Sequence, residues 1–257
     1  MNKYTKILIF LFIILFIINY PILDKALINF LEDSESVFIT EIVDGDTAKT
    51  NETAIRLLGI NSPEKGEEYY EEAKQFLKSK ILNEKVELKF TSEKTDLYGR
   101  TLAYIISEDK NINFQLVENG FANCYFYDKD NYHKECQKIW KTCINSNKNL
   151  CEKSYDKCSG CIILESFDYK NEELIFRNIC NFDCNLAKWT IKDEGRKKFV
   201  FPEFILKQNY KLTIKISEGK DSDSILFWRK QDYVWTDSGD TLFLRDSKNK
   251  LVLWENY

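Results

Sequence analysis

Short alternating and apolar runs predict strands in the first half of the chain, with helices between them. Val37 to Val43 alternates apolar and polar residues, whereas Glu67 to Leu82 has apolar residues at three- and four-residue intervals, as an amphipathic helix does. The remaining runs predict strands at Ala54 to Leu58, Val86 to Phe90 and Leu102 to Ile106, and helices at Asn113 to Asn119 and Lys134 to Ile144. This order favours an OB-like β-barrel with helices (α+β) over a doubly wound sheet, in which strands and helices would alternate.

The second half has short apolar runs separated by turn residues. They predict strands at Ile162 to Leu164, Leu174 to Phe176, Phe199 to Phe201, Leu212 to Ile216, Ile225 to Trp228, Thr241 to Leu244 and Leu251 to Trp254. Such a series is typical of an all-β sandwich. A polar stretch with cysteines precedes it, so we expect two domains, residues 36–144 and 160–257, joined by a linker over residues 145–159.

Residues 1–35 are expected to act as a membrane anchor or a signal segment. Lys3 and Lys6 precede an apolar run from Ile7 to Ile18, and mostly acidic residues follow it. By the positive-inside rule, the residues after this run lie outside the cytoplasm. An uncleaved anchor would place the protein at the cell membrane, a cleaved peptide would release it, and a buried core helix is the third alternative.

The charge balance limits the ways in which this chain could bind nucleic acid. Its formal net charge is −4 at pH 7, so a broad basic face is not expected and any phosphate contact should be local. The chain has one histidine, His133, which excludes mechanisms that need a pair of histidines.

The eight cysteines are all in the middle of the chain. They are Cys124, Cys136, Cys143, Cys151, Cys158, Cys161, Cys180 and Cys184. An even number after an export-like segment favours disulfide bonds, although the connectivity cannot be deduced from sequence. The spacing of the last four also suits a four-thiolate zinc site, which stays as the alternative.

Three short motifs bring together the residue types of a phosphodiester-cleaving site. They are Asp44-Gly45-Asp46-Thr47, the stretch from Arg56 to Glu64, and Asp96-Leu97-Tyr98-Gly99-Arg100. Carboxylate and carbonyl oxygens suit a hard cation such as Ca²⁺, and guanidinium groups suit phosphate oxygens. Together they indicate metal-assisted hydrolysis, in which a carboxylate takes a proton from the attacking water.

In the order and spacing of these motifs, residues 37 to about 144 resemble the staphylococcal nuclease (thermonuclease) family. The resemblance implies an OB-like barrel that binds Ca²⁺, or another divalent cation, and cleaves DNA and/or RNA. It implies catalytic roles for Arg56, Glu64 and Arg100, metal ligation by Asp46, Asn61 and Ser62, and substrate contacts by Tyr98, Tyr125 and Tyr127.

Two positions depart from the family pattern. Asn61 stands where the family commonly has a second aspartate ligand, and an amide oxygen without charge would hold the metal more weakly. Leu97 stands where a basic residue is common, which would weaken phosphate binding.

The second half resembles the lamin tail domain, an immunoglobulin-like sandwich. The resemblance rests on Asn181 through Trp189-Thr190-Ile191-Lys192-Asp193 and on Val234 through Asp246. Such domains bind or tether, and the sequence indicates neither the ligand of this one nor the oligomeric state.

Three functions follow from these observations. The first is an exported, membrane-tethered, metal-dependent nuclease. The second is a catalytically inactive surface binding protein that uses the sandwich and a degenerate nuclease fold. The third is a structural envelope protein, which would bind neither metal nor nucleic acid.

Overall fold

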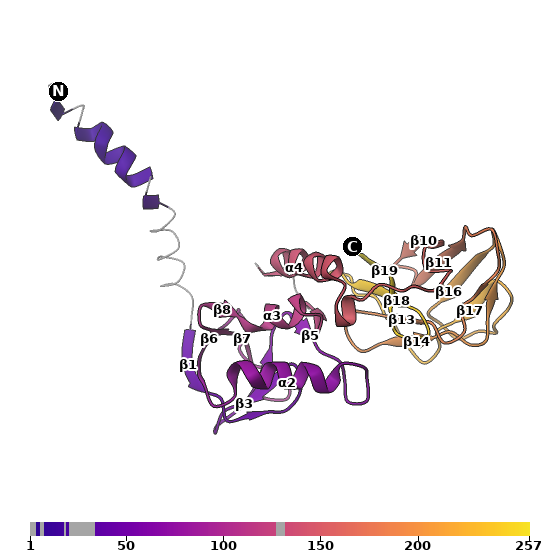
Figure 1. Ribbon diagram of the computed structural model, residues 1–257, viewed down its shortest axis with the longest axis horizontal. Helices are drawn as coiled ribbons and strands as arrows, with labels where there is room; N and C mark the ends of the chain where they lie inside the picture. Colours follow the sequence, from indigo (N-terminus) through magenta and orange to yellow (C-terminus); the bar gives the residue numbers. More distant parts are fainter. Residues whose placement is uncertain (1–3, 6–7, 18, 21–33, 127–131) are drawn as a thin grey trace.

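The computed structural model describes residues 4–5, 8–17, 19–20, 34–126 and 132–257. Residues 8–17 are helical. Among the described residues, no helix combines the length and the apolar character that crossing a membrane requires. The rest forms an N-terminal unit that contains β1 to β9 and a C-terminal unit that contains β10 to β19 (Figure 1).

The N-terminal unit is built on one curved sheet with the strand order β1-β6-β7-β4-β3-β2, and β8 pairs with β7. Its strands are β1 (Ser34–Phe38), β2 (Glu41–Ile42), β3 (Thr47–Lys49), β4 (Ala54–Leu57), β6 (Lys85–Lys89), β7 (Thr101–Ser107) and β8 (Lys110–Asn111). A separate pair consists of β5 (Ile60–Asn61) and β9 (Asn123–Cys124). The mixed α+β content of this unit is consistent with the predicted OB-like fold.

The strand predicted from Val37 to Val43 is divided into β1 and β2. β1 pairs with β6, whereas β2 pairs with β3. The change occurs at Ile39 and Thr40, whose N–H groups donate to the carbonyls of Glu84 and Lys49 on opposite sides of the sheet. The single alternating run from Val37 to Val43 therefore contributes to two strands that pair with different partners.

Three helices cover the sheet: α2 (Tyr70–Ile81), α3 (Ile112–Glu118) and α4 (His133–Ser146). Helix α2 buries Ala73, Leu77 and Ile81, which belong to the predicted apolar stripe, but begins at Tyr70 instead of Glu67. The side chain of Asn113, fully buried, accepts a hydrogen bond from Ile105 N (3.0 Å) and donates to Leu58 O (2.8 Å). It thereby fixes α3 to the sheet.

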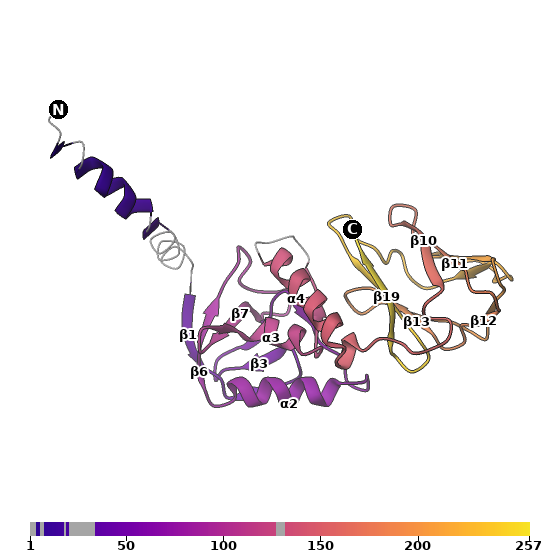
Figure 2. The ribbon, with the colours of Figure 1, turned by 45° about the horizontal axis from the view of Figure 1, so that its top comes forward.

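The C-terminal unit consists mostly of strands, in two four-stranded sheets and one two-stranded sheet, and is compatible with a β-sandwich (Figure 2). The first sheet contains β10 (Ile162–Asp168), β11 (Glu173–Asn178), β16 (Lys211–Lys215) and β17 (Ile225–Phe227). The second contains β14 (Lys198–Val200), β13 (Thr190–Lys192), β18 (Thr241–Arg245) and β19 (Leu251–Asn256), and β12 (Cys184–Asn185) pairs with β15 (Ile205–Leu206). Buried side chains that include Trp189, Phe176 and Leu212 form its core.

All eight cysteines are paired in disulfide bonds: Cys124–Cys136, Cys143–Cys151, Cys158–Cys184 and Cys161–Cys180. The first bond joins β9 to α4, and the second joins α4 to η1 (Asn149–Cys151). Part of the expected linker is therefore attached to the N-terminal unit through Cys151, whereas Cys158 is bonded to the C-terminal unit.

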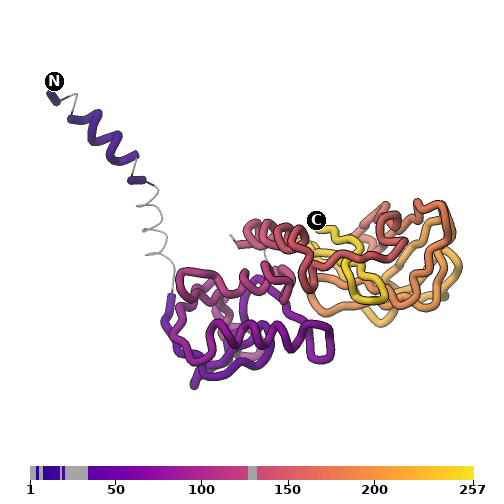
Figure 3. The backbone as a smooth tube through the Cα atoms, in the orientation of Figure 1, coloured from indigo at the N-terminus to yellow at the C-terminus, as the bar shows by residue number. Residues whose placement is uncertain are grey.

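The two units pack against each other, and the trace in Figure 3 shows the C-terminal segment returning beside α4. Phe243 and Leu251 belong to the same buried cluster as the core of the N-terminal unit, and the Phe243 ring lies edge-on to Trp140 with centroids 5.4 Å apart. Lys153 forms a parallel bridge with Leu251. The C-terminal unit is thereby held against the edge of the N-terminal unit.

Candidate active site

The turn between β2 and β3 places two aspartates at the edge of the barrel. Val43 N donates to Thr47 O (2.9 Å), and Asp46 N donates to the Asp44 carboxylate (3.1 Å), so that the turn closes on itself. A Cβ added at Gly45 would lie 2.7 Å from Ala73 Cβ and 2.8 Å from Ser62 Cβ. Only glycine allows the turn to approach Ser62 and α2 this closely.

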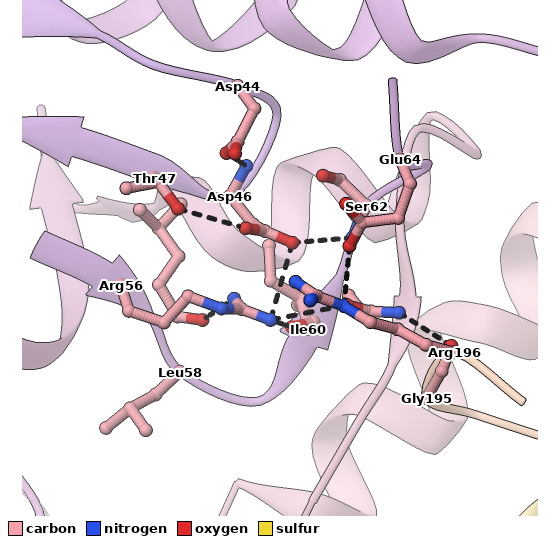
Figure 4. Close-up of polar contacts among 12 residues, drawn as sticks. Asp44, Asp46, Thr47, Arg56, Leu58, Ile60, Ser62, Glu64, Gly195 and Arg196 are labelled. Carbon is pink, nitrogen blue, oxygen red and sulfur yellow. Dashed lines mark hydrogen bonds and ion pairs between the residues drawn. The ribbon is translucent and has the colours of Figure 1, made fainter. Parts of the chain in front are cut away.

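Asp46 is buried and makes the central contacts of the cluster in Figure 4. Its Oδ2 accepts a hydrogen bond from Ser62 N (2.8 Å) and lies 3.4 Å from Arg56 Nη2. Its Oδ1 accepts one from Thr47 Oγ1 (3.2 Å). The predicted metal ligands Asp46 and Ser62 are therefore neighbours.

Arg56, on β4, is also buried, and its guanidinium faces the loop that follows the strand. Nη1 donates to Leu57 O (2.6 Å) and Nη2 to Ile60 O (2.9 Å). These bonds satisfy a charged group that would otherwise be costly to bury, and they hold it beside Asp46.

Asn61 contacts both units. Its Oδ1 lies 3.4 Å from Arg56 Nη2, while its Nδ2 donates to Gly195 O (2.9 Å) and Glu194 O (3.4 Å) of the C-terminal unit. An aspartate here could not donate to those carbonyls. The amide that departs from the family pattern is thus the group that contacts the second unit.

Glu64 lies in the loop between β5 and α2, at the mouth of the cluster. Its side chain is half-exposed, and its Oε1 is 2.7 Å from Arg196 Nε (Figure 4). Nearby, Glu67 accepts a hydrogen bond from Glu64 N (3.1 Å) and pairs with Lys192 (3.2 Å). Burial alone would raise the pKa of Glu67, but the positive charge of Lys192 and the hydrogen bonds lower it below its usual value.

Arg100 and Tyr98 lie on a separate loop beside β4. Arg100 immediately precedes β7, whose first residue, Thr101, pairs with Ile55 next to Arg56. Its Nε bonds the Asp96 carboxylate (2.7 Å), and its guanidinium lies 5.6 Å from the centre of the Tyr98 ring. Tyr98 is 85% exposed. Arg100 is therefore half-buried on the neighbouring loop and, among the described residues, makes no direct contact with the cluster.

The other two tyrosines predicted to contact the substrate are Tyr125 and Tyr127. Tyr125 follows β9, and its N–H donates to Gly59 O (3.0 Å), which places it beside the β5 strand that carries Asn61. Tyr127 lies outside the described residues.

The residues present fit a divalent cation with oxygen ligands. Burial raises the pKa of Asp44, and the negative charge of Asp46 raises it further. A cation between these carboxylates and the neutral oxygens of Asn61 and Ser62 would offset that repulsion. Within the described part of the chain, no three carboxylates lie close enough to share an ion, so this donor set depends on neutral oxygens.

A cavity of about 320 Å³ lies between the two units. Pro63, Gly66 and Glu67 line it from the N-terminal unit, and Lys188, Lys192 and Lys198 from the C-terminal unit. The C-terminal unit therefore forms one wall of this cavity, which Asp46, Arg56 and Glu64 do not line.

Comparison with known proteins identifies the class of the chain as a nuclease. The family model of staphylococcal nuclease homologues matches residues 54–153. A thermonuclease from Staphylococcus intermedius is 30% identical over 130 residues, which cover 46% of this chain and 77% of that protein. The chain belongs to the staphylococcal nuclease family.

Two further relatives agree with this assignment. A thermonuclease from Staphylococcus hyicus is 28% identical over 123 residues, covering 44% of this chain and 73% of that protein. The endonuclease YhcR from Bacillus subtilis (strain 168) is 32% identical over 106 residues, covering 34% of this chain and 9% of that protein. The family match ends at residue 153, and the likeness of the C-terminal unit to the lamin tail domain stays a prediction.

Sequence reasoning missed two features of this site. Asp44 was visible in the first motif, where its spacing from Asp46 could have identified it. Nothing in the local sequence around Glu194, Gly195 and Arg196 indicates contact with Asn61, which lies 133 positions before Glu194.

Proposed function

We propose that this protein is a Ca²⁺-dependent nuclease that hydrolyses phosphodiester bonds in DNA, RNA or both. The observation that carries the proposal is the grouping of Asp46, Arg56 and Glu64 at one edge of the barrel, in a chain whose relatives are named thermonucleases and endonucleases. Another divalent cation in place of Ca²⁺ is the alternative.

Each group of residues in the site has its own role in the proposed reaction. Asp46, with the oxygens of Asn61 and Ser62, would hold the ion, and the bound ion would supply positive charge against the phosphate. Glu64 accepts the proton of the attacking water because its carboxylate is half-exposed at the mouth of the site. Arg56 and Arg100 donate hydrogen bonds to phosphate oxygens, on which negative charge increases in the transition state. Tyr98, Tyr125 and Tyr127 contact the nucleotides.

We further propose that the protein is exported and tethered to the membrane by residues 1–35, or secreted if this segment is cleaved. Its four disulfide bonds support an oxidising compartment, in which such bonds persist. The C-terminal unit is proposed to be an immunoglobulin-like, lamin-tail-like accessory domain.

Cleavage assays with the full chain test the nuclease proposal. Single-stranded DNA, double-stranded DNA and RNA are incubated with Ca²⁺ or with chelator, using wild type, Glu64→Gln and the surface control Glu52→Gln. We expect cleavage that chelator abolishes and that Glu64→Gln slows about 10²- to 10⁴-fold, because the amide cannot take the proton. Glu52 is exposed on a turn, so its variant should cleave like wild type.

The inactive binding protein is the second candidate, and the amide at position 61 favours it because it removes one charge from the cation site. Folded wild-type protein that cleaves none of the three substrates with Ca²⁺, Mg²⁺ or Mn²⁺ would replace the nuclease proposal with this one. Equal rates for Glu64→Gln and wild type would instead reject only the role of Glu64.

A further inference from the structure

The loop between β13 and β14 brings Arg196 of the C-terminal unit to the mouth of the nuclease site. Figure 4 shows the side chain extending from this loop toward Glu64, in the same cluster as Asp46 and Arg56. Its Nε lies 2.7 Å from Glu64 Oε1. Because the side chain is 69% exposed, it can reach both Glu64 and a ligand in solvent.

The loop is held in place by contacts other than Arg196. The Glu194 carbonyl accepts hydrogen bonds from Asn123 Nδ2 (2.9 Å) and Asn61 Nδ2 (3.4 Å), and the Gly195 carbonyl accepts one from Asn61 Nδ2 (2.9 Å). The Glu194 carboxylate accepts hydrogen bonds from Phe126 N (3.0 Å) and Thr241 Oγ1 (3.1 Å). Most of these groups are buried, so the position of the loop does not depend on its exposed arginine.

The pair between Arg196 and Glu64 contributes little to stability. Its side chains are 69% and 46% exposed, and pairs this exposed are weak because water and salt screen them. Among the described residues, the guanidinium has no ion pair other than the one with Glu64, so its two terminal nitrogens are available to a ligand. A planar group with free, parallel N–H donors suits a phosphate.

We propose that Arg196 is a substrate-binding residue of the nuclease site, supplied by the C-terminal unit, and that it contacts a phosphate of the nucleic acid. Its Nε orients Glu64 while Nη1 and Nη2 donate to phosphate oxygens. The C-terminal unit is then part of the substrate site as well as an accessory domain. This inference rests on the proposed nuclease function.

The test compares full-length wild type, Arg196→Ala, Arg196→Lys and the control Arg229→Ala. Arg229 is a half-exposed arginine of the same unit that pairs with Asp221 (2.7 Å). Steady-state cleavage of single-stranded DNA in Ca²⁺ is measured at several salt concentrations. We expect Arg196→Ala to lower kcat/KM about 10- to 100-fold, mainly through KM, with partial recovery in Arg196→Lys and no change in Arg229→Ala.

The salt dependence separates a phosphate contact from a structural role. Losing one contact to a single strand should reduce the slope of log affinity against log salt by about 0.7, whereas a structural role would leave the slope unchanged. Unchanged kcat/KM and slope in Arg196→Ala would overturn the proposal. A raised kcat/KM would also overturn it, since Arg196 would then block Glu64.

If the wild-type protein does not cleave DNA, its binding to single-stranded DNA is measured instead. Fluorescence anisotropy of a labelled oligothymidine is then measured with the same four proteins. Weaker binding and a smaller salt slope in Arg196→Ala support the contact even if the nuclease function fails. Equal binding by wild type and Arg196→Ala, or no binding by wild type, overturns it.

Discussion

The side chain of Asn61 serves two neighbours with opposite requirements. The proposed cation site favours an oxygen with negative charge, whereas the carbonyls of Glu194 and Gly195 need a hydrogen-bond donor. An amide provides an oxygen on one side and an N–H donor on the other. Asparagine therefore carries no charge at the proposed cation site but attaches Asn61 to the C-terminal unit.

Replacing Asn61 with aspartate should separate these two roles. We expect Asn61→Asp to lower the free energy of unfolding by about 1–3 kcal/mol without Ca²⁺, because a carboxylate would face two carbonyl oxygens. We also expect tighter Ca²⁺ binding, because a charge is added beside Asp46. Urea unfolding and calorimetric titration with Ca²⁺ measure the two effects.

The matched control is Asn123→Asp, which removes a similar donor to Glu194 O (2.9 Å) without touching the expected ion site. It should lose stability without gaining affinity for Ca²⁺. If Asn61→Asp binds Ca²⁺ no more tightly than wild type, Asn61 is not a ligand. If its stability is unchanged, the amide does not hold the units together.

At the scale of elements, the site depends on how closely the β2–β3 turn approaches α2. We expect Gly45→Ala to destabilise the fold by about 1–3 kcal/mol, because the new methyl group would overlap Ala73 and Ser62. Cleavage should also slow, since Asp46 and Ser62 would move apart. Urea unfolding and single-stranded DNA cleavage test both expectations.

Gly160→Ala is the control for that experiment. A Cβ at Gly160 meets no atom within 4 Å, so the free energy of unfolding should change by no more than about 0.5 kcal/mol. Wild-type stability in Gly45→Ala would mean that the turn can move away from α2 without cost.

The sequence predicted elements best where a single periodic pattern extended over many residues. The apolar stripe of α2 and the runs of β16 and β18 required no knowledge of their partners. Short elements were harder: β5 and β9 have two residues each and form only because they pair with each other. The same limit applies to β13, whose Trp189 to Asp193 region was noted as a motif but not as a strand.

The candidate site shows the same limit. The motifs predicted Asp46, Arg56, Ser62 and Glu64, which the structure brings together, because each lies on a turn or strand of one small barrel. Sequence reasoning could not find Arg196, since its position depends on how two units pack. Contacts of this kind depend on surfaces far apart in the chain, which local patterns do not encode.

At the scale of the whole molecule, the junction between the units contains three acidic groups that are costly to ionise. Burial raises the pKa of Asp193 to about 7, of Glu194 to about 8 and of Asp240 to about 6, and repulsion between the carboxylates adds to the first two shifts. Glu194 also accepts the hydrogen bond from Phe126 N of the other unit. Ionisation here therefore affects the same loop that carries Arg196.

These shifts predict that the protein becomes less stable as pH rises from about 5 to 8. In the unfolded chain the three groups lose their protons near pH 4, whereas in the folded protein they keep them to higher pH. Over this range the folded state binds more protons, so the free energy of unfolding falls with pH. The total fall is several kcal/mol, because each group loses about 1.4 kcal/mol per pH unit between its unfolded and folded pKa. Urea unfolding at pH 5.5 and pH 8 measures this difference.

The variant Glu194→Gln tests whether the Glu194 carboxyl causes most of this pH dependence of stability. The amide keeps an oxygen that can accept the hydrogen bond from Phe126 N but cannot ionise, so we expect a smaller loss between pH 5.5 and pH 8 and greater stability than wild type at pH 8. Glu203→Gln, an exposed position, should keep the wild-type pH dependence. If wild type and Glu194→Gln lose the same free energy over this range, the carboxyl of Glu194 is not the group that destabilises the junction. In that case, the cleavage rate of Arg196→Ala would be measured at pH 5.5 and pH 8. It would show whether the loop affects cleavage without a contribution from the Glu194 carboxyl.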